Sequence, residues 1–389
     1  MIADFVVYIL LGLGIWALWI WFQKQTIDDC LLQIQFFPLL VFHLIVSFYF
    51  NDFIDLEGGD AERYWSVTAD LSQYASSWMQ YFGFSTFFIQ WLNYYPAKIW
   101  DLSFLTGNLI YSCISFLGMI WGLLLTRLYF PKTKGNFLTA FLPFLVWWFP
   151  GLHFWTAGVG KESLLFIGLI GSIWSISFDR LNVFGFLIGA GILIMVRPVW
   201  GIFIVVPLLF FTIKKWKSNL ISQLVIVAFT SILVWKGLGW IWERAHLKEL
   251  SVNEFTKFSS EQLAFLEGYE ANSSLPIQTM SFGERMFAVS FRPFPWEIWS
   301  WQSLIYSLEN LIFLILLFLI PIAIVSKRIQ IRWRPLLVIL GILLVWVSFS
   351  LTLNNYGVIY RMKSIWLPPL FIALLWLIWP FVLSNKSKV

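Results

Sequence analysis

Long runs of apolar residues, separated by short polar stretches, follow one another along almost the whole chain. A helix crosses a membrane with roughly 20 apolar residues, and with fewer where neighbouring helices shield its ends. The pattern therefore predicts an all-α fold, a polytopic membrane helix bundle that forms a single transmembrane domain over residues 1–389. We expect about eleven transmembrane helices by this criterion, near residues 5–22, 31–50, 105–125, 137–149, 164–178, 183–196, 199–213, 220–238, 304–325, 336–353 and 366–383.

Two long segments, 51–104 and 239–302, stand outside this series of apolar runs. The first contains an apolar stretch, Trp78–Tyr95, which Gln80, Gln90 and Asn93 interrupt. We interpret that stretch as an interfacial or re-entrant helix. A crossing there would exchange the sides of every later loop, and the basic clusters would then face outward. The second segment has no long apolar run, and we expect it to form a small helical cap on the outer face.

The placement of charge decides which ends of these helices face the cytoplasm. Only 12% of the residues are charged, whereas a soluble protein has about 25%. With the N-terminus outside, 14 of the 26 basic residues fall in six short cytoplasmic connections. This bias follows the positive-inside rule, so we expect the N-terminus outside and the C-terminus in the cytoplasm. The net charge of +5 is explained in this way and indicates no nucleic-acid partner.

The first candidate site residue is Asp60, in the sequence Glu57-Gly-Gly-Asp-Ala-Glu-Arg-Tyr-Trp65 that follows the second predicted span. The two glycines permit a tight turn, and Asp60 is a candidate N-cap for the next helix. Alternatively, Asp60 is a carboxylate at the membrane face that accepts a proton from a hydroxyl group or holds a metal.

Lys161 and Glu162 lie at the predicted start of the fifth span, where ionisable groups are costly unless they have a role. A lysine near a helix N-terminus makes an electropositive site suited to phosphate. The other interpretation is an ion pair that reaches the surface. Arg197 lies between two apolar runs with almost no loop, so we expect its guanidinium to face a polar cavity.

Two later segments supply the remaining candidates for substrate binding. Arg292 and Glu297 are the charged groups of Phe291-Arg-Pro-Phe-Pro-Trp-Glu297, which reads equally well as an aromatic membrane anchor. The last predicted outer turn holds Asn355, Tyr356, Arg361 and Lys363. An arginine there can bind a phosphate through two parallel hydrogen bonds, which a lysine cannot.

These cations and one acidic loop suit an anionic substrate embedded in the membrane. In addition, three short motifs resemble those of a known family. Asp60 to Tyr64 is similar to the Asp-x-x-x-Tyr element of GT-C-type membrane glycosyltransferases. Gly160-Lys161-Glu162, and Asn355-Tyr356-Gly357 followed by Arg361, resemble motifs of EpsG-type and Wzy-type polysaccharide polymerases. The chain departs from classical GT-C members because no adjacent pair of acidic residues stands in the first outer loop.

The resemblance implies an enzyme that transfers or polymerises polyprenyl-diphosphate-linked glycan at the outer face of a bacterial inner membrane. Asp60 and Glu162 would then be catalytic, and the basic residues would hold the diphosphate. Its partners would be the lipid-linked glycan, membrane lipids and other proteins of envelope polysaccharide assembly. No cofactor is expected. A divalent metal has no supporting ligand motif, since the three histidines show no metal-binding spacing.

Two other functions remain open from the residues alone. A transporter or flippase of the same lipid-linked glycan also needs basic residues, although it needs them along a path through the bilayer. An outward-facing acyltransferase needs a nucleophile and a base, for which His153 and Ser163 are the nearby candidates.

Overall fold

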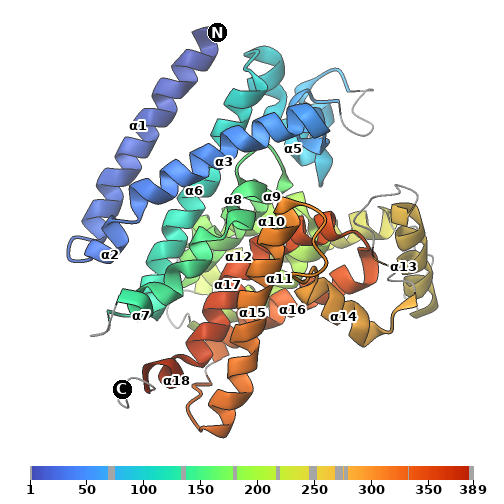
Figure 1. Cartoon of the computed structure of the whole chain (residues 1–389). Helices are drawn as coiled ribbons and strands as arrows, with labels where there is room; N and C mark the ends of the chain where they lie inside the picture. Colours follow the sequence, from blue (N-terminus) through green and yellow to red (C-terminus); the bar gives the residue numbers. More distant parts are fainter. Residues whose placement is uncertain are drawn as a thin grey trace. The chain divides into compact units, whose positions relative to one another are not determined.

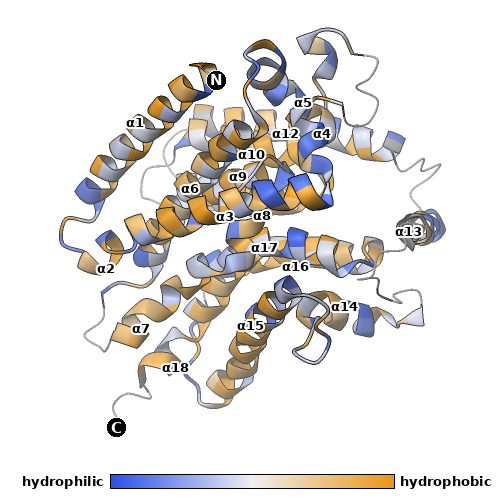
Figure 2. Ribbon diagram, turned by 45° about the horizontal axis from the view of Figure 1, so that its top comes forward, coloured by the Kyte–Doolittle hydropathy of each residue, from blue (hydrophilic) through white to orange (hydrophobic). Residues whose placement is uncertain are grey.

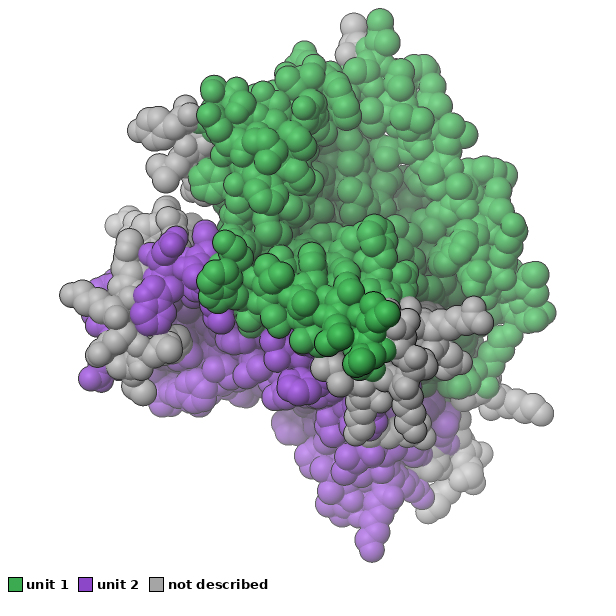
Figure 3. Space-filling model, turned by 180° about the vertical axis from the view of Figure 1, so that it is seen from behind, with its two compact units in different colours: residues 1–202, 216–237 green, residues 203–215, 238–389 purple. Residues whose placement is uncertain are grey.

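The computed structural model describes residues 2–68, 75–132, 137–177, 182–215, 220–244, 252–267, 275, 279–331 and 333–384. Within these ranges the chain is helical and contains no β-strand, as the apolar pattern predicts. It divides into two compact units: residues 1–202 with 216–237, and residues 203–215 with 238–389 (Figure 3). Each unit is described by itself below.

Unit 1 contains the helices of the first half of the chain (Figure 1). They are α1 (Ile2–Gln25), α2 (Cys30–Gln33), α3 (Phe36–Glu57), α4 (Asp60–Trp65), η2 (Trp78–Tyr81), α5 (Thr86–Asn93), η3 (Tyr94–Ile99), α6 (Phe104–Tyr129), α7 (Phe137–Phe141), η4 (Leu142–Trp148), α8 (Pro150–Thr156), α9 (Lys161–Ser177) and α10 (Val183–Val196). Two further helices, α11 (Pro198–Lys215) and α12 (Leu220–Arg244), each have residues assigned to both units.

Local residue chemistry sets the ends of several of these helices. Ser103 accepts a hydrogen bond from the Thr106 backbone N–H (3.2 Å) at the start of α6, and Asn182 does the same for Gly185 (2.9 Å) at α10. Helix α3 ends at Gly58, whose φ of 73° is accessible to glycine at little cost. These caps place the polar turns where the apolar runs stop.

Helices α9 and α10 pack closely through small residues. A Cβ atom added to Gly189 would lie 2.8 Å from the Gly168 carbonyl oxygen and 2.4 Å from the Ser172 hydroxyl. Only glycine permits this approach of the two backbones, which is the usual way that helices associate inside a membrane. The tight hairpin buries α9 along almost its whole length.

Helix α1 is attached to α6 through Asp4. The Asp4 carboxylate accepts hydrogen bonds from the Ser103 backbone N–H (2.8 Å) and from the Thr106 hydroxyl (2.6 Å). Apolar side chains over most of α1, including Phe5 and Trp16, are exposed. Helix α1 is thus held at one end by buried polar contacts and presents an apolar surface suited to lipid along its length.

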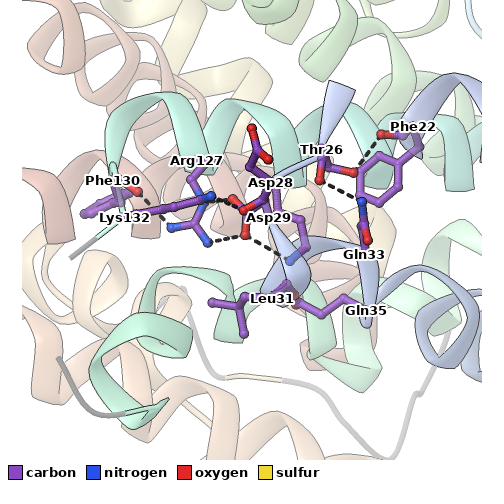
Figure 4. A network of polar contacts seen from close by, with 11 residues as sticks. Phe22, Thr26, Asp28, Asp29, Leu31, Gln33, Gln35, Arg127, Phe130 and Lys132 are labelled. Atoms are coloured by element: carbon purple, nitrogen blue, oxygen red, sulfur yellow. Dashed lines mark hydrogen bonds and ion pairs between the residues drawn. The ribbon is translucent and has the colours of Figure 1, made fainter. Parts of the chain in front are cut away.

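The opposite end of α6 is fixed by an ion pair with the turn between α1 and α2 (Figure 4). The Asp29 carboxylate forms an ion pair with Arg127, 2.6 Å from its Nε, and accepts a hydrogen bond from its Nη2 (3.1 Å). Asp29 also caps α2 by accepting from the Leu32 backbone N–H (3.3 Å). The contact between Asp29 and Arg127 connects the turn after α1 to the last turn of α6.

Unit 2 contains α13 (Val252–Glu267), α14 (Phe282–Phe291), α15 (Trp301–Val325), α16 (Trp333–Thr352), α17 (Tyr356–Leu377) and α18 (Trp379–Ser384). Apolar residues, orange in Figure 2, run along most of α15. Helix α17 is almost wholly buried. Helices α13 and α14 lie within residues 239–302, the segment that was predicted to form a helical cap. Asn354, just after α16, donates a hydrogen bond to the Leu263 carbonyl (3.2 Å), so α13 packs at that end of α16.

The prediction of a polytopic helix bundle is confirmed, but the number of spans is different. Among the described residues, eight helical segments are long and apolar enough to cross a membrane. They are 2–25, 30–57, 104–129, 137–156, 223–243, 301–325, 333–352 and 356–377. The predicted spans 164–178, 183–196 and 199–213 correspond to α9 with 17 residues, α10 with 14 residues, and α11, whose described apolar part is Pro198–Phe210. All three are shorter than the roughly 20 residues of a full span.

Trp78–Tyr95 forms no single helix. It is divided among η2, α5 and the start of η3, and each of these pieces is too short to span a membrane. Stacked rings of Trp78 and Trp91, 5.0 Å apart, hold the pieces together. Several basic residues used to orient the chain, among them Lys134, Arg180 and Arg332, lie outside the described residues.

Candidate functional site

Asp60 is the first residue of α4, directly after two glycines with positive φ, Gly58 (73°) and Gly59 (154°). The residue at the N-cap position is Gly59, so Asp60 begins the helix where we expected it to cap the helix. Its side chain is exposed, and its Oδ2 accepts a hydrogen bond from the hydroxyl of Tyr64 (3.4 Å), one turn later. The glycine turn therefore presents a carboxylate at the end of α3, held toward a buried tyrosine.

Lys161 begins α9 and is buried at the same end of unit 1. Its Nζ donates hydrogen bonds to the hydroxyls of Thr86 (2.9 Å) and Ser85 (3.1 Å). It also lies 5.2 Å from the centre of the Tyr64 ring, within the range of a cation–π interaction. Tyr64 thus contacts both Lys161 and Asp60, and it joins two predicted site residues that are far apart in the sequence.

Ser85 has an unusual backbone conformation, with φ 61° and ψ −121°. Side chains disfavour this region, and such strain persists only where surrounding contacts hold it. One of those contacts is a hydrogen bond from the Ser85 N–H to the Met195 carbonyl (2.7 Å), near the end of α10. The bond ties the loop before α5 to the turn that carries Arg197.

Glu162 and Arg197 come together across the start of α9 and the end of α10. Arg197 Nη2 lies 3.9 Å from Glu162 Oε1, and the Glu162 side chain is almost fully buried. The Arg197 guanidinium also lies 4.8 Å from the ring centre of Trp200. A carboxylate at the N-terminus of α9 is favoured by the helix dipole. The arrangement makes Glu162 a partner that positions Arg197.

The structure therefore brings Asp60, Lys161, Glu162 and Arg197 to one end of unit 1, linked by a short series of contacts. Sequence reasoning missed the three side chains that make this series: Tyr64 as the contact of Lys161, and Ser85 and Thr86 as its hydrogen-bond acceptors. Tyr64 was present in the Asp-x-x-x-Tyr element. The two hydroxyls carry no motif, since serine and threonine are common in every loop.

In unit 2, Arg292 and Glu297 form an ion pair at the end of α14. Arg292 Nε donates to Glu297 Oε1 (2.8 Å) and Oε2 (3.1 Å), and the backbone N–H of Phe294 donates to Oε2 (2.9 Å). Partial burial raises the pKa of Glu297, but the hydrogen bonds from Arg292 and Phe294 outweigh it and leave the pKa below its ordinary value. The hydrogen bond to Glu297 raises the pKa of Arg292.

Asn355 and Tyr356 lie at the start of α17, close to this ion pair. The Asn355 side chain caps the helix by accepting from the N–H groups of Gly357 (2.8 Å) and Val358 (3.3 Å). The Tyr356 ring stacks on Trp299 at 5.2 Å between centroids, and the Arg292 guanidinium lies 5.6 Å from its centre. Asn355 therefore has a structural role, and Tyr356 provides an aromatic face beside Arg292.

Arg361 and Lys363 lie inside α17, whereas the apolar pattern had placed them in an outer turn before a helix starting at 366. Arg361 is half-buried. Lys363 is buried, donates to the Ser290 carbonyl (2.9 Å) and contacts Asn310 of α15. Nearby, Tyr360 donates to Glu309. The hydropathy criterion missed this part of the helix because polar neighbours, and not lipid, surround its charged residues.

Two further expectations concern metals and nucleophiles. Among the described residues no three His, Cys, Asp or Glu side chains are grouped closely enough to hold a metal ion. Ser163 donates to the carbonyls of Gly158 (2.7 Å) and Thr156 (3.0 Å). The two ring nitrogens of His153 face His43 and the Trp147 carbonyl, so His153 and Ser163 do not form the serine–histidine pair that acyl transfer requires.

The two clusters are thus Asp60, Tyr64, Lys161, Glu162 and Arg197 in unit 1, and Arg292, Glu297 and Tyr356 with the buried Lys363 in unit 2. Comparison with known proteins adds no assignment for either of them. No protein-family model matches the chain, and neither a curated protein nor a solved structure was found to be similar to it.

Proposed function

We propose that the chain is a multi-pass membrane glycosyltransferase or polymerase that acts on polyprenyl-diphosphate-linked glycan. It would work at the extracytoplasmic face of a bacterial inner membrane, with its N-terminus outside and its C-terminus in the cytoplasm, and build a surface polysaccharide. The observation that supports this most is the contact series from Asp60 through Tyr64 to Lys161. It places an exposed carboxylate and a buried cation at the same end of unit 1.

The proposed chemistry divides the work between these groups. Asp60 takes the proton of an acceptor sugar hydroxyl as that oxygen attacks the anomeric carbon of the donor sugar. The bond between this carbon and the diphosphate oxygen breaks, and negative charge develops on the leaving group. Lys161 and Arg197 stabilise that charge, since cations held in a site of low dielectric act more strongly than in water. Glu162 keeps Arg197 in place.

Unit 2 contributes binding groups in this proposal. Arg292 is fixed by Glu297 and lies beside the face of Tyr356, which suits a phosphate on one side and an apolar or sugar ring on the other. Arg361 is a further candidate for phosphate binding within unit 2. Lys363 is engaged with Ser290 and Asn310, and we assign it to the support of α17.

The test uses purified protein in lipid vesicles with a fluorescent polyprenyl-diphosphate oligosaccharide, and it measures formation of longer glycan. We expect Asp60→Asn and Lys161→Ala each to reduce the rate at least 100-fold, the usual scale for general-base and electrostatic groups. Asp52→Asn, an exposed carboxylate on α3, and Lys98→Ala, an exposed lysine after α5, are the matched controls and keep the rate. Movement of labelled lipid across the vesicle without a new glycosidic bond would instead identify a flippase.

A further inference from the structure

Two fully buried histidines form a polar cluster inside unit 1 that the proposed chemistry does not use. Nδ1 of His43, on α3, lies 2.9 Å from Nδ1 of His153, on α8. Both side chains have no exposed surface. A polar pair at this depth among membrane helices is costly unless its hydrogen bonds are made, so each contact of the two rings has a definite proton requirement.

The contact of His153 fixes one proton. Its Nε2 lies 2.9 Å from the Trp147 carbonyl oxygen, which can only accept. His153 must therefore carry its proton on Nε2, and its Nδ1 is a lone pair in the neutral ring. The 2.9 Å contact between the two Nδ1 atoms then requires the proton to be on His43. A neutral His43 is left with a lone pair on Nε2.

That Nε2 atom faces α6. It lies 2.9 Å from the Ser115 hydroxyl and 3.2 Å from the Ser112 carbonyl oxygen. The Ser115 hydroxyl has two further acceptors, the Thr156 carbonyl oxygen at 2.7 Å and the Ser112 carbonyl oxygen at 2.9 Å. Ser115 has a single proton to donate. With neutral rings it cannot satisfy His43 and Thr156 together, so at least one of these two contacts stays without a proton.

One added proton completes the cluster. The four contacts are His153 with Trp147, His153 with His43, His43 with Ser115 or Ser112, and Ser115 with Thr156, and each needs a proton. Two neutral imidazoles and one hydroxyl supply three. A proton taken from water at His43 Nε2 gives that atom a donor for Ser115 and Ser112, and it frees the Ser115 hydroxyl for Thr156.

We propose that His43 and His153 form a proton-binding site inside the membrane unit, with Ser115 as the switch that changes its acceptor when the proton arrives. The groups facing the two rings are neutral in every described contact: Phe42 of α3, Ser112, Ser115 and Phe116 of α6, and the Trp147 carbonyl of η4. The Ser112, Trp147 and Thr156 carbonyl oxygens surround the cluster, and they take the place of water around the added charge.

The switch reaches the start of α9. The Thr156 carbonyl that accepts the hydrogen bond from Ser115 also accepts one from Ser163 (3.0 Å), two residues after Lys161. A carbonyl oxygen has two lone pairs, so it can hold both donors at once. Protonation of the histidine pair thereby adds a hydrogen bond between α6 and the turn that leads into α9.

The chain has three histidines, which makes the site directly observable by ¹⁵N nuclear magnetic resonance. Full-length protein labelled at histidine, in lipid nanodiscs, gives three pairs of ring signals, and His246→Gln removes one. At neutral pH we expect an Nδ1–Nδ1 coupling across the hydrogen bond between the other two, with His43 protonated on Nδ1 and His153 on Nε2. Acidification should convert both nitrogens of His43 to N–H while the coupling persists.

The variants Ser115→Ala and Ser163→Ala distinguish the hydroxyl that contacts His43 from a neighbouring hydroxyl that does not. Ser115→Ala removes the hydroxyl from His43 Nε2, and the ¹⁵N shift of that nitrogen at neutral pH should move toward the value of an unbonded lone pair. Ser163→Ala leaves the ring contacts intact and should keep the wild-type shift. Absence of the Nδ1–Nδ1 coupling, or no proton uptake by the pair before the protein unfolds, would overturn the proposal. Neither result depends on whether the chain transfers sugar.

Discussion

Arg197 and Glu162 face each other across the ends of α9 and α10, with Nη2 and Oε1 3.9 Å apart. The Glu162 side chain is almost fully buried, whereas Arg197 keeps about a quarter of its side-chain surface exposed. Removing the cation of such a pair costs more than removing both partners, because the buried carboxylate then loses a neighbouring positive charge.

We therefore expect Arg197→Ala to lower the free energy of unfolding by about 2 kcal/mol, below the range for hydrogen-bonded buried pairs because the contact is longer. Glu162→Gln combined with Arg197→Ala should recover most of that loss. Thermal unfolding in detergent measures both variants. Equal destabilisation by the single and double variants would contradict the view that Glu162 depends on Arg197.

The packing of α9 on α10 can be tested with two glycines of the same helix. Gly189→Val should destabilise unit 1 by about 2 kcal/mol or more, because overpacking forces backbones apart and the added Cβ would overlap Ser172 and Gly168. Gly191→Val is the matched control, since a Cβ there meets nothing within 4 Å. Thermal unfolding in the same detergent should separate the two variants clearly. Similar midpoints would mean that the close approach of the helices does not matter.

The Arg292–Glu297 pair should make unit 2 sensitive to acid. The hydrogen bonds from Arg292 and Phe294 hold the pKa of Glu297 below its usual 4.5. The pair's contribution is therefore fully present above the usual value, and it is lost as the pH falls through the lower pKa of the folded state. Since both side chains are partly solvated, we expect the pair to contribute about 1 kcal/mol to the free energy of unfolding.

Glu297→Gln should remove this acid dependence and leave the stability at neutral pH lower than that of the wild type. The measurement is the unfolding midpoint as a function of pH from 3 to 7, taken on wild type and variant in parallel. Glu261→Gln, in an exposed pair with Lys257 on α13, serves as the control because exposed pairs contribute little. If Glu297→Gln keeps the wild-type dependence of the unfolding midpoint on pH, other groups cause that dependence.

The contact between Asp29 and Arg127 predicts a difference between two neighbouring acidic residues. Asp29→Asn should weaken both the ion pair and the cap of α2, and destabilise unit 1 by about 2 kcal/mol, as expected for a partly buried charged hydrogen bond. Asp28→Asn should change little, because Asp28 enters this network through its backbone carbonyl, which Lys132 contacts. Hydrogen exchange of α2 amides would report the loss locally.

The sequence predicted the class of fold and the position of most helices, because apolar length follows directly from the thickness of the bilayer. It placed the start of the fifth span at residue 164, close to the observed start of α9 at Lys161, for the same reason. It failed at α17, where Arg361 and Lys363 were read as a turn. Asn355 is a recognisable helix-capping residue, and more weight on that signal would have found the helix start.

The site was harder to predict than the helices. Asp60 and Lys161 were chosen as candidate site residues because of their unusual position at predicted membrane boundaries. Their connection was not, because Tyr64, Ser85 and Thr86 gain meaning only when the fold brings them to Lys161. The histidine pair is a similar case: His43 and His153 are separated by 110 residues. No local pattern can encode such a contact.

Helix α6 touches Asp4 with its first turn and Asp29 with its last, while α1 connects the same two aspartates along the chain. The two helices therefore act as opposite sides of a frame whose lengths must agree. Deleting one residue from the middle of α6 would draw Arg127 in by about 1.5 Å and rotate it by roughly 100°. The guanidinium would leave Asp29 although every side chain of the ion pair remained. In this part of the protein, helix length is constrained as strictly as residue identity.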